Sequence, residues 1–146
     1  MTIKHIAAIA VIAAGLGHVA PAMAAIDQEA FCSTLLKGVS LVPSEFIAIR
    51  TTASDKFEGW ETSLTLADQR CWIEKNVDRN ILACRMIDTS FDQLRDLVQG
   101  CVPQYALKDF SDESGPYVQY SNGSAAVQIM LTKSSVAPLV IFTAPF

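Results

Sequence analysis

Apolar and polar residues alternate between positions 58 and 84, and the pattern predicts three antiparallel strands. In residues 58–66 the even-numbered positions are mostly apolar and the odd-numbered ones polar, which is typical of a strand with one face in water. A four-residue link at 67–70 would place Leu66 opposite Cys71 and Leu64 opposite Ile73. The apolar faces of the first two strands would then coincide.

A second four-residue loop, at 76–79, pairs Ile73 with Leu82 and brings Cys71 opposite Cys84. Directly opposite residues of antiparallel strands have Cα atoms about 4.5–5.5 Å apart, which a disulfide can bridge. The register therefore predicts a Cys71–Cys84 disulfide. The remaining cysteines, Cys32 and Cys101, would form the second one. The cysteine spacings match no zinc or redox motif, which favours structural disulfides.

Two segments have helical periodicity. The first runs from about Gln28 to Lys37, with Asp27 as its N-cap and Gly38 as its stop. The second follows Ser90, whose spacing from Gln93 is that of a capping box, and ends at Gly100. Between them, residues 42–52 suit either a short helix or a strand. We favour the short helix, followed by a loop at 53–56.

The C-terminal part is predicted as a polar connection at 104–116 followed by three strands. Acidic residues in that connection lack the regular ligand spacing of a calcium loop, which favours a solvated loop. A tight turn at Asn122-Gly123 would pair Tyr120 with Ala125 and direct Gln119 and Gln128 away from the apolar face. Pro138 places the last strand, within 136–146, at a sheet edge or a bulge. Such an apolar edge invites self-association or a covering partner.

This order of elements predicts one disulfide-stapled α+β domain over residues 25–146. We expect a two-layer structure, in which a twisted antiparallel sheet of two three-stranded meanders carries two or three helices on one face.

Residues 1–24 have the pattern of a cleaved signal peptide. A basic start precedes an apolar run of 11 residues, and Ala22 and Ala24 supply the small side chains of a cleavage site. The run is too short to span a bilayer, which takes roughly 20 residues, so we expect no stable membrane anchor after cleavage. The predicted location is periplasmic or secreted, where disulfides persist.

Composition narrows the chemistry further. Both histidines, His5 and His18, lie in the signal peptide, so the secreted chain would have none. This disfavours Ser-His-Asp and Cys-His catalysis and most zinc or copper sites. Cleavage would leave ten basic and fifteen acidic side chains, a net charge of −5. The basic residues are scattered, so we expect no nucleic-acid binding. We expect no cofactor and no enzymatic activity.

The leading hypothesis is a non-enzymatic protein that binds another envelope or secreted protein, as an inhibitor, accessory factor or assembly factor. Candidate contact residues are Trp72, Tyr117 and Tyr120, because exposed aromatic side chains often anchor interfaces, although packing within the fold is the more frequent fate of such side chains.

Two alternatives remain open. One is a cell-envelope glycan hydrolase that uses Glu58 and Glu61 beside Trp60, although a regular strand would direct the two carboxylates to opposite faces. The other is a carrier of a small apolar ligand in the space between the sheet and the helices.

Overall fold

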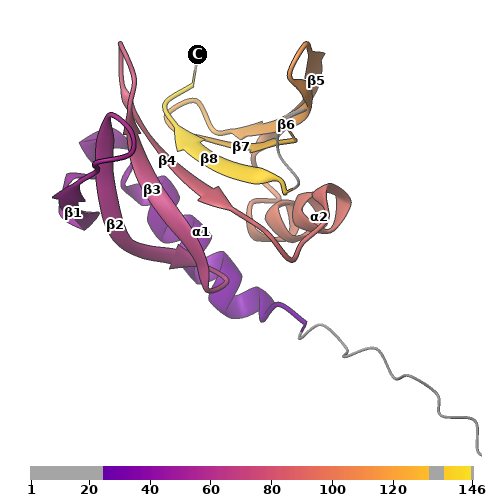
Figure 1. The fold of residues 1–146 in the computed structure, drawn as a ribbon. Helices are drawn as coiled ribbons and strands as arrows, with labels where there is room; N and C mark the ends of the chain where they lie inside the picture. Colours follow the sequence, from indigo (N-terminus) through magenta and orange to yellow (C-terminus); the bar gives the residue numbers. More distant parts are fainter. Residues whose placement is uncertain (1–24, 132–136, 146) are drawn as a thin grey trace, which may run out of the picture.

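The chain folds into two successive units, each a helix followed by a four-stranded antiparallel meander (Figure 1). This computed structural model describes residues 25–131 and 137–145, so the predicted signal peptide lies outside the described residues. The first unit comprises α1 (Gln28–Ser40), two 3-10 turns η1 (Val42–Ser44) and η2 (Ile47–Ile49), and strands β1 (Arg50–Ala53), β2 (Gly59–Leu66), β3 (Gln69–Lys75) and β4 (Asn80–Arg85). The second comprises α2 (Phe91–Cys101), β5 (Ala106–Asp112), β6 (Gly115–Ser121), β7 (Ala126–Met130) and β8 (Leu139–Thr143).

Both meanders belong to one eight-stranded sheet in the order β1-β2-β3-β4-β8-β7-β6-β5. The antiparallel β4–β8 pair joins the two units at the centre. The α+β class with two disulfides agrees with the prediction, but the sheet is larger than two three-stranded meanders. The six predicted strands form its middle, and the two unpredicted strands, β1 and β5, are its edges.

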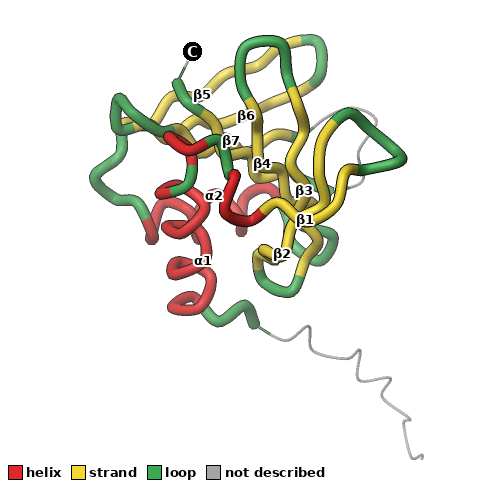
Figure 2. The backbone as a smooth tube through the Cα atoms, turned by 90° about the vertical axis from the view of Figure 1, so that its left-hand side faces the viewer, coloured by secondary structure: helices red, strands yellow, loops and turns green. Residues whose placement is uncertain are grey.

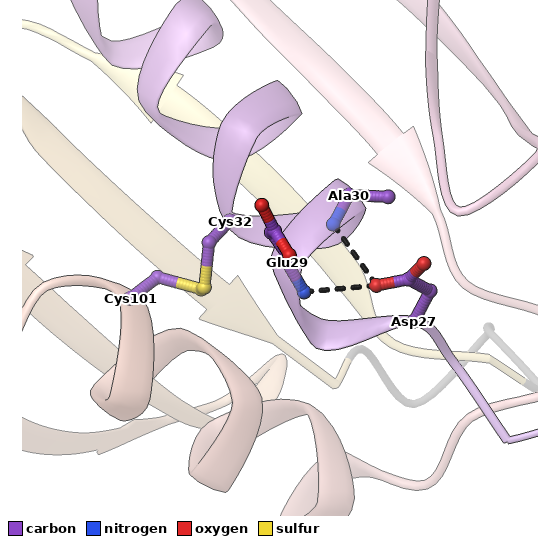
Figure 3. Close-up of a disulfide and its surroundings, with 5 residues drawn as sticks. All are labelled: Asp27, Glu29, Ala30, Cys32 and Cys101. Carbon is purple, nitrogen blue, oxygen red and sulfur yellow. Dashed lines mark hydrogen bonds between the residues drawn. A yellow bond between two sulfur atoms is a disulfide. The ribbon is translucent and has the colours of Figure 1, made fainter.

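The two helices pack against each other and against the same face of the sheet (Figure 2). The core between the layers is closed by side chains with almost no exposure, among them Phe31, Leu35, Leu82, Leu94 and Phe142. A disulfide joins Cys32 of α1 to Cys101 of α2, beside the Asp27 carboxylate that caps α1 (Figure 3). A second one joins Cys71 to Cys84, the pairing that the strand register predicts.

Both helices extend past their predicted ends. Asp27 and Ser90 cap them as expected, and the Ser90–Gln93 capping box is complete. However, α1 continues through Gly38 to Ser40. Gly38 does not end the helix; instead it allows close packing against Phe142. A Cβ atom at Gly38 would lie 2.8 Å from Cε1 of Phe142. Likewise α2 continues through Gly100 to Cys101.

Residues 42–53 contain both helical turns and a strand, the two structures that the sequence allowed for residues 42–52. The two 3-10 turns η1 and η2 stand where a short helix was expected. Strand β1 follows at Arg50–Ala53, so its last residue overlaps the first residue of the loop predicted at 53–56. Glu45 and Phe46 between the two turns both have positive φ, 51° and 62°. The reversal of the chain there places the Phe46 ring in the core, fully buried.

The predicted β2–β3 register is wrong, although the predicted faces are right. Leu66 pairs with Gln69, and Trp60 with Ile73. The link is a two-residue turn, in which Ala67 and Asp68 both adopt positive φ as in a type I′ turn. The register shifts again between Glu61 and Thr65. Each displacement moves the pairing by an even number of residues, so no side chain changes face.

The predicted β6–β7 register is also wrong, because the turn between these strands is centred one residue later than predicted. Tyr120 pairs with Val127, because the central turn residues are Gly123 and Ser124. Gly123, with φ of 86°, occupies the first central position, as in type II′ turns. Asn122 instead closes the turn with its side chain, whose Oδ1 accepts hydrogen bonds from the backbone amides of Ser124 and Ala125.

Two predicted placements at the sheet edges are also wrong. β8, for which Pro138 predicted an edge position or a bulge, lies at the centre of the sheet, paired with β4 and β7. Pro138 directly precedes the strand, so it removes no hydrogen bond from the ladder. The connection predicted at 104–116 instead contains β5, whose seven residues are all exposed. Because β8 is paired on both sides, it offers no free edge to a second copy of the chain.

Candidate functional site

The face of the sheet turned away from the helices, called the open face below, carries a continuous row of side chains. Successive strand partners from β2 to β5 define this row, since directly paired residues point to the same side. Its members are Glu61, Trp72, Ala83, Ile141, Gln128, Gln119 and Lys108. Four open-face residues are nevertheless almost inaccessible: Ala83 (2% exposed), Ala126 (0%), Gln128 (6%) and Thr143 (0%).

A hollow of about 520 Å³ lies over the β5–β8 part of the open face. Its volume is within the range of ligand-binding pockets, about 300–1,000 Å³. Its lining residues come from the β3–β4 hairpin and from β5, β6, β7 and β8. In Figure 1 that hairpin and β5 rise on either side of β8 and β7. Its apolar lining consists of Ile81, Phe110, Tyr117, Met130 and Ile141. Its polar lining consists of Asn76, Lys108, Asp112, Gln119, Gln128 and Thr143.

An aromatic pair forms one wall of the hollow. Phe110 of β5 and Tyr117 of β6 are direct strand partners. Their rings are stacked, with centroids 4.8 Å apart and planes 8° from parallel. Phe110 remains 38% exposed, an unusual position for a large apolar side chain on an edge strand. The pair therefore offers a fixed, flat apolar surface to whatever enters the hollow.

Two glutamine side chains occupy the next row. Gln119 and Gln128 are direct strand partners, and Nε2 of Gln128 donates to Oε1 of Gln119 at 3.5 Å. A primary amide can take part in up to four hydrogen bonds, so one long bond leaves most of their capacity unused. Thr143 of β8 is also among the lining residues, and its buried Oγ1 has no hydrogen-bond partner among the described residues. Unsatisfied buried groups of this kind are rare in folded proteins.

One cation and one anion stand at the rim, on the same strand. Lys108 and Asp112 of β5 lie four residues apart, or about 13 Å along a strand. Lys108 makes no ion pair within the described part of the chain. Asp112 accepts hydrogen bonds from Ser114, through Oγ at 2.5 Å and the backbone amide at 2.8 Å. These bonds lower the pKa of the Asp112 carboxyl below its ordinary value, so it is ionised at neutral pH.

Trp72 lies on the same face near the other end of the sheet. It pairs with Glu61 on one side and Ala83 on the other, and its indole is half-buried. The guanidinium of Arg85 lies 6.0 Å from the ring centroid, at the outer limit of a cation–π contact. Four strand spacings, about 19 Å, separate Trp72 on β3 from Tyr117 on β6.

Tyr120 is not a surface residue, which corrects its assignment to the contact surface. It lies on the helix-facing side of β6, is 0% exposed, and donates its hydroxyl to the backbone carbonyl of Arg95 at 3.1 Å. Desolvation by burial raises the pKa of its phenol above the ordinary value. Tyr120 therefore anchors α2 to the sheet. The candidate set is reduced to Trp72 and Tyr117, which share one face but belong to different clusters.

The glutamates of the hydrolase alternative each have their own basic partner. Glu61 accepts two hydrogen bonds from Nη2 of Arg70, at 2.6 and 2.7 Å. Glu58 lies 3.0 Å from Nζ of Lys75. Trp60 packs against the core side of the sheet, with the Arg50 guanidinium 3.9 Å above its ring. Glu61 and Trp60 thus occupy opposite faces, and the three side chains form no common site.

The other parts of the described structure offer less room or fewer free polar groups for a ligand. The space between sheet and helices, expected to serve an apolar-ligand carrier, is filled by the core side chains. A second hollow of about 330 Å³ contains Glu45 and Asn80, which hydrogen-bond each other at 2.7 Å. Among the described residues, no cluster of three potential metal ligands occurs and no helix is long and apolar enough to cross a membrane.

The residues that line the hollow were largely missed by sequence reasoning. Phe110 and Asp112 fell in the predicted connection, although the alternation Lys108, Phe110, Asp112 is the period of a strand. Gln119 and Gln128 were correctly directed away from the apolar face, but nothing local indicated that they meet. Comparison with family models, curated proteins and solved structures found no match for this chain.

Proposed function

We propose that this is a non-enzymatic protein of the periplasm or extracellular space that binds another envelope or secreted protein through the open face of its sheet. The observation that carries the proposal is the composition of that face. An antiparallel sheet covered on one side usually presents polar residues on the other. Here the uncovered side carries Trp72, Leu139 and Ile141, all only partly buried, in addition to the aromatic pair.

The Trp72 end is the part of this face that is suited to a protein partner. Its indole is flanked by two charged groups, the Arg85 guanidinium and the Glu61–Arg70 ion pair. A large apolar side chain ringed by polar groups is the usual composition of an interface anchor. Two intramolecular disulfides are consistent with an oxidising compartment, where such a partner would be met.

The test compares three forms of the protein on an affinity column loaded with envelope extract from the source organism. Trp72→Ala removes the proposed anchor. Ile87→Ala is the matched control, because Ile87 is 67% exposed and lies in the connection from β4 to α2. We expect a stoichiometric protein partner that is retained by the wild type and by Ile87→Ala. Trp72→Ala should weaken its affinity about tenfold or more, a typical loss for an interface anchor.

Urea unfolding of each variant checks that the fold is intact. Two results would count against the proposal: a monomeric protein that retains no partner, or a partner that Trp72→Ala retains as well as Ile87→Ala does.

A further inference from the structure

The hollow over β5–β8 has a chemistry of its own, distinct from that of the Trp72 end. It combines a flat aromatic wall, two under-used amides and one charge of each sign. From these groups we infer that the hollow binds an uncharged sugar unit that carries an N-acetyl group. This site goes beyond the proposed protein partner, because it lies over β5–β8 and does not include Trp72, the proposed interface anchor.

The aromatic wall suits one face of a sugar ring. A pyranose has an apolar face of C–H groups and a rim of hydroxyl groups. The flat apolar surface of the stacked Phe110–Tyr117 pair matches that C–H face. Because the two rings stack on each other, the pair is already ordered before a ligand arrives, which lowers the entropy cost of binding.

The amides suit the N-acetyl group. An acetamido substituent has one N–H donor and one carbonyl acceptor, which complement the donor and acceptor groups of the half-buried Gln119 amide. The Gln128 amide lies beside it, although this side chain is only 6% exposed. Met130 and Ile141 lie beside these glutamines in the sheet and provide apolar contact for the acetyl methyl group. Polar ligand groups in this position would satisfy amides that are otherwise half-used.

The charges indicate an uncharged ligand. The one cation, Lys108, and the one carboxylate, Asp112, cancel at the rim, so neither an anionic nor a cationic ligand is favoured overall. An acyl chain fits poorly, because it would cover the polar lining residues without offering them hydrogen bonds. A single carboxylate also lacks the partner that glycoside hydrolysis requires, so we assign binding and not cleavage.

The test is a titration of the ¹⁵N-labelled protein, expressed from the full chain, with two tetrasaccharides of the same linkage. One consists of N-acetylglucosamine and the other of glucose. We expect the N-acetylglucosamine tetrasaccharide to shift the side-chain amide resonances of Gln119 and Gln128. The glucose tetrasaccharide, which lacks the acetamido group, should bind about tenfold more weakly, a difference of roughly 1.4 kcal/mol.

Two substitutions on one strand localise the effect. Phe110→Ala removes one of the two rings of the aromatic wall, whereas Leu107→Ala removes a side chain of nearly equal exposure, 40% against 38%, from the opposite face of β5. Phe110→Ala should weaken binding of the N-acetylglucosamine tetrasaccharide about tenfold. Leu107→Ala and Trp72→Ala should leave it unchanged, which separates this site from the proposed protein interface.

Three results would overturn the inference. The first is that neither tetrasaccharide shifts the resonances at millimolar concentration. The second is that both bind equally well, which removes the role of the N-acetyl group. The third is that Phe110→Ala binds as the wild type does.

Discussion

Replacing Cys32 and Cys101 together by alanine should destabilise the protein strongly, because the unfolded chain gains conformational entropy when the crosslink is removed. This disulfide closes a loop with a sequence separation of 69, whereas Cys71 and Cys84 are separated by only 13. Loop-closure entropy then assigns about 4.4 kcal/mol to the first disulfide and about 2.9 kcal/mol to the second. The larger value is a substantial share of the 5–15 kcal/mol by which folded domains are usually stable.

Urea unfolding, followed by tryptophan fluorescence and circular dichroism, measures both the free energy and its slope with urea, the m-value. Removal of the Cys32–Cys101 crosslink should raise the m-value, because the unfolded chain expands and exposes more surface. The Cys71→Ala/Cys84→Ala variant is the control. Its two sulfurs are buried in the sheet, so it also loses packing, but its shorter loop should change the m-value less. A loss below about 2 kcal/mol for Cys32→Ala/Cys101→Ala with an unchanged m-value would refute the entropic reasoning.

Three further predictions concern single residues. Tyr120→Phe should cost about 1 kcal/mol in urea unfolding, because the hydroxyl loses its bond to the Arg95 carbonyl. Because the pKa of Tyr120 is raised in the folded state, its contribution to stability is fully present below the unfolded pKa of about 10. This contribution is lost as the pH rises through the folded pKa. The variant should therefore lose stability less steeply at alkaline pH, and an unchanged slope would contradict this. Gly123→Ala should cost about 1–2 kcal/mol through its positive φ alone, since nothing lies within 4 Å of a Cβ there. Gly115→Ala should cost more, because its Cβ would lie 2.2 Å from the Leu131 carbonyl oxygen, and equal costs would exclude that clash.

Features that depend on neighbouring residues could be predicted from the sequence, whereas features that depend on contacts between distant segments could not. Capping was predictable, because the Asp27 and Ser90 side chains bond to amides within three residues of themselves. The Cys71–Cys84 pair was predictable, because one loop length fixes the register of its hairpin. Glycine was a weaker guide. Gly38 marks close packing on Phe142, a contact made across more than a hundred residues of chain.

Turn geometry accounts for the two wrong registers. At Ala67-Asp68, two non-glycine residues adopt a conformation that usually selects glycine or asparagine, so the tight turn had no local signal. At Asn122-Gly123-Ser124 the signal was present, but it was assigned one residue too early. Because both errors preserved the parity of the strands, the core face was still assigned correctly.

The amino-acid sequence by itself determined which residues face the core, where the helices begin and which cysteines can pair. These properties depend on side-chain periodicity and on contacts within one hairpin or one helical turn. Only the tertiary structure decided the order of the strands, with β8 at the centre and β5 at an edge. It also decided that Phe110, Gln119, Gln128 and Thr143, drawn from four strands, surround one hollow. The physical reason is that strand order depends on pairings between distant segments, and no local pattern encodes them.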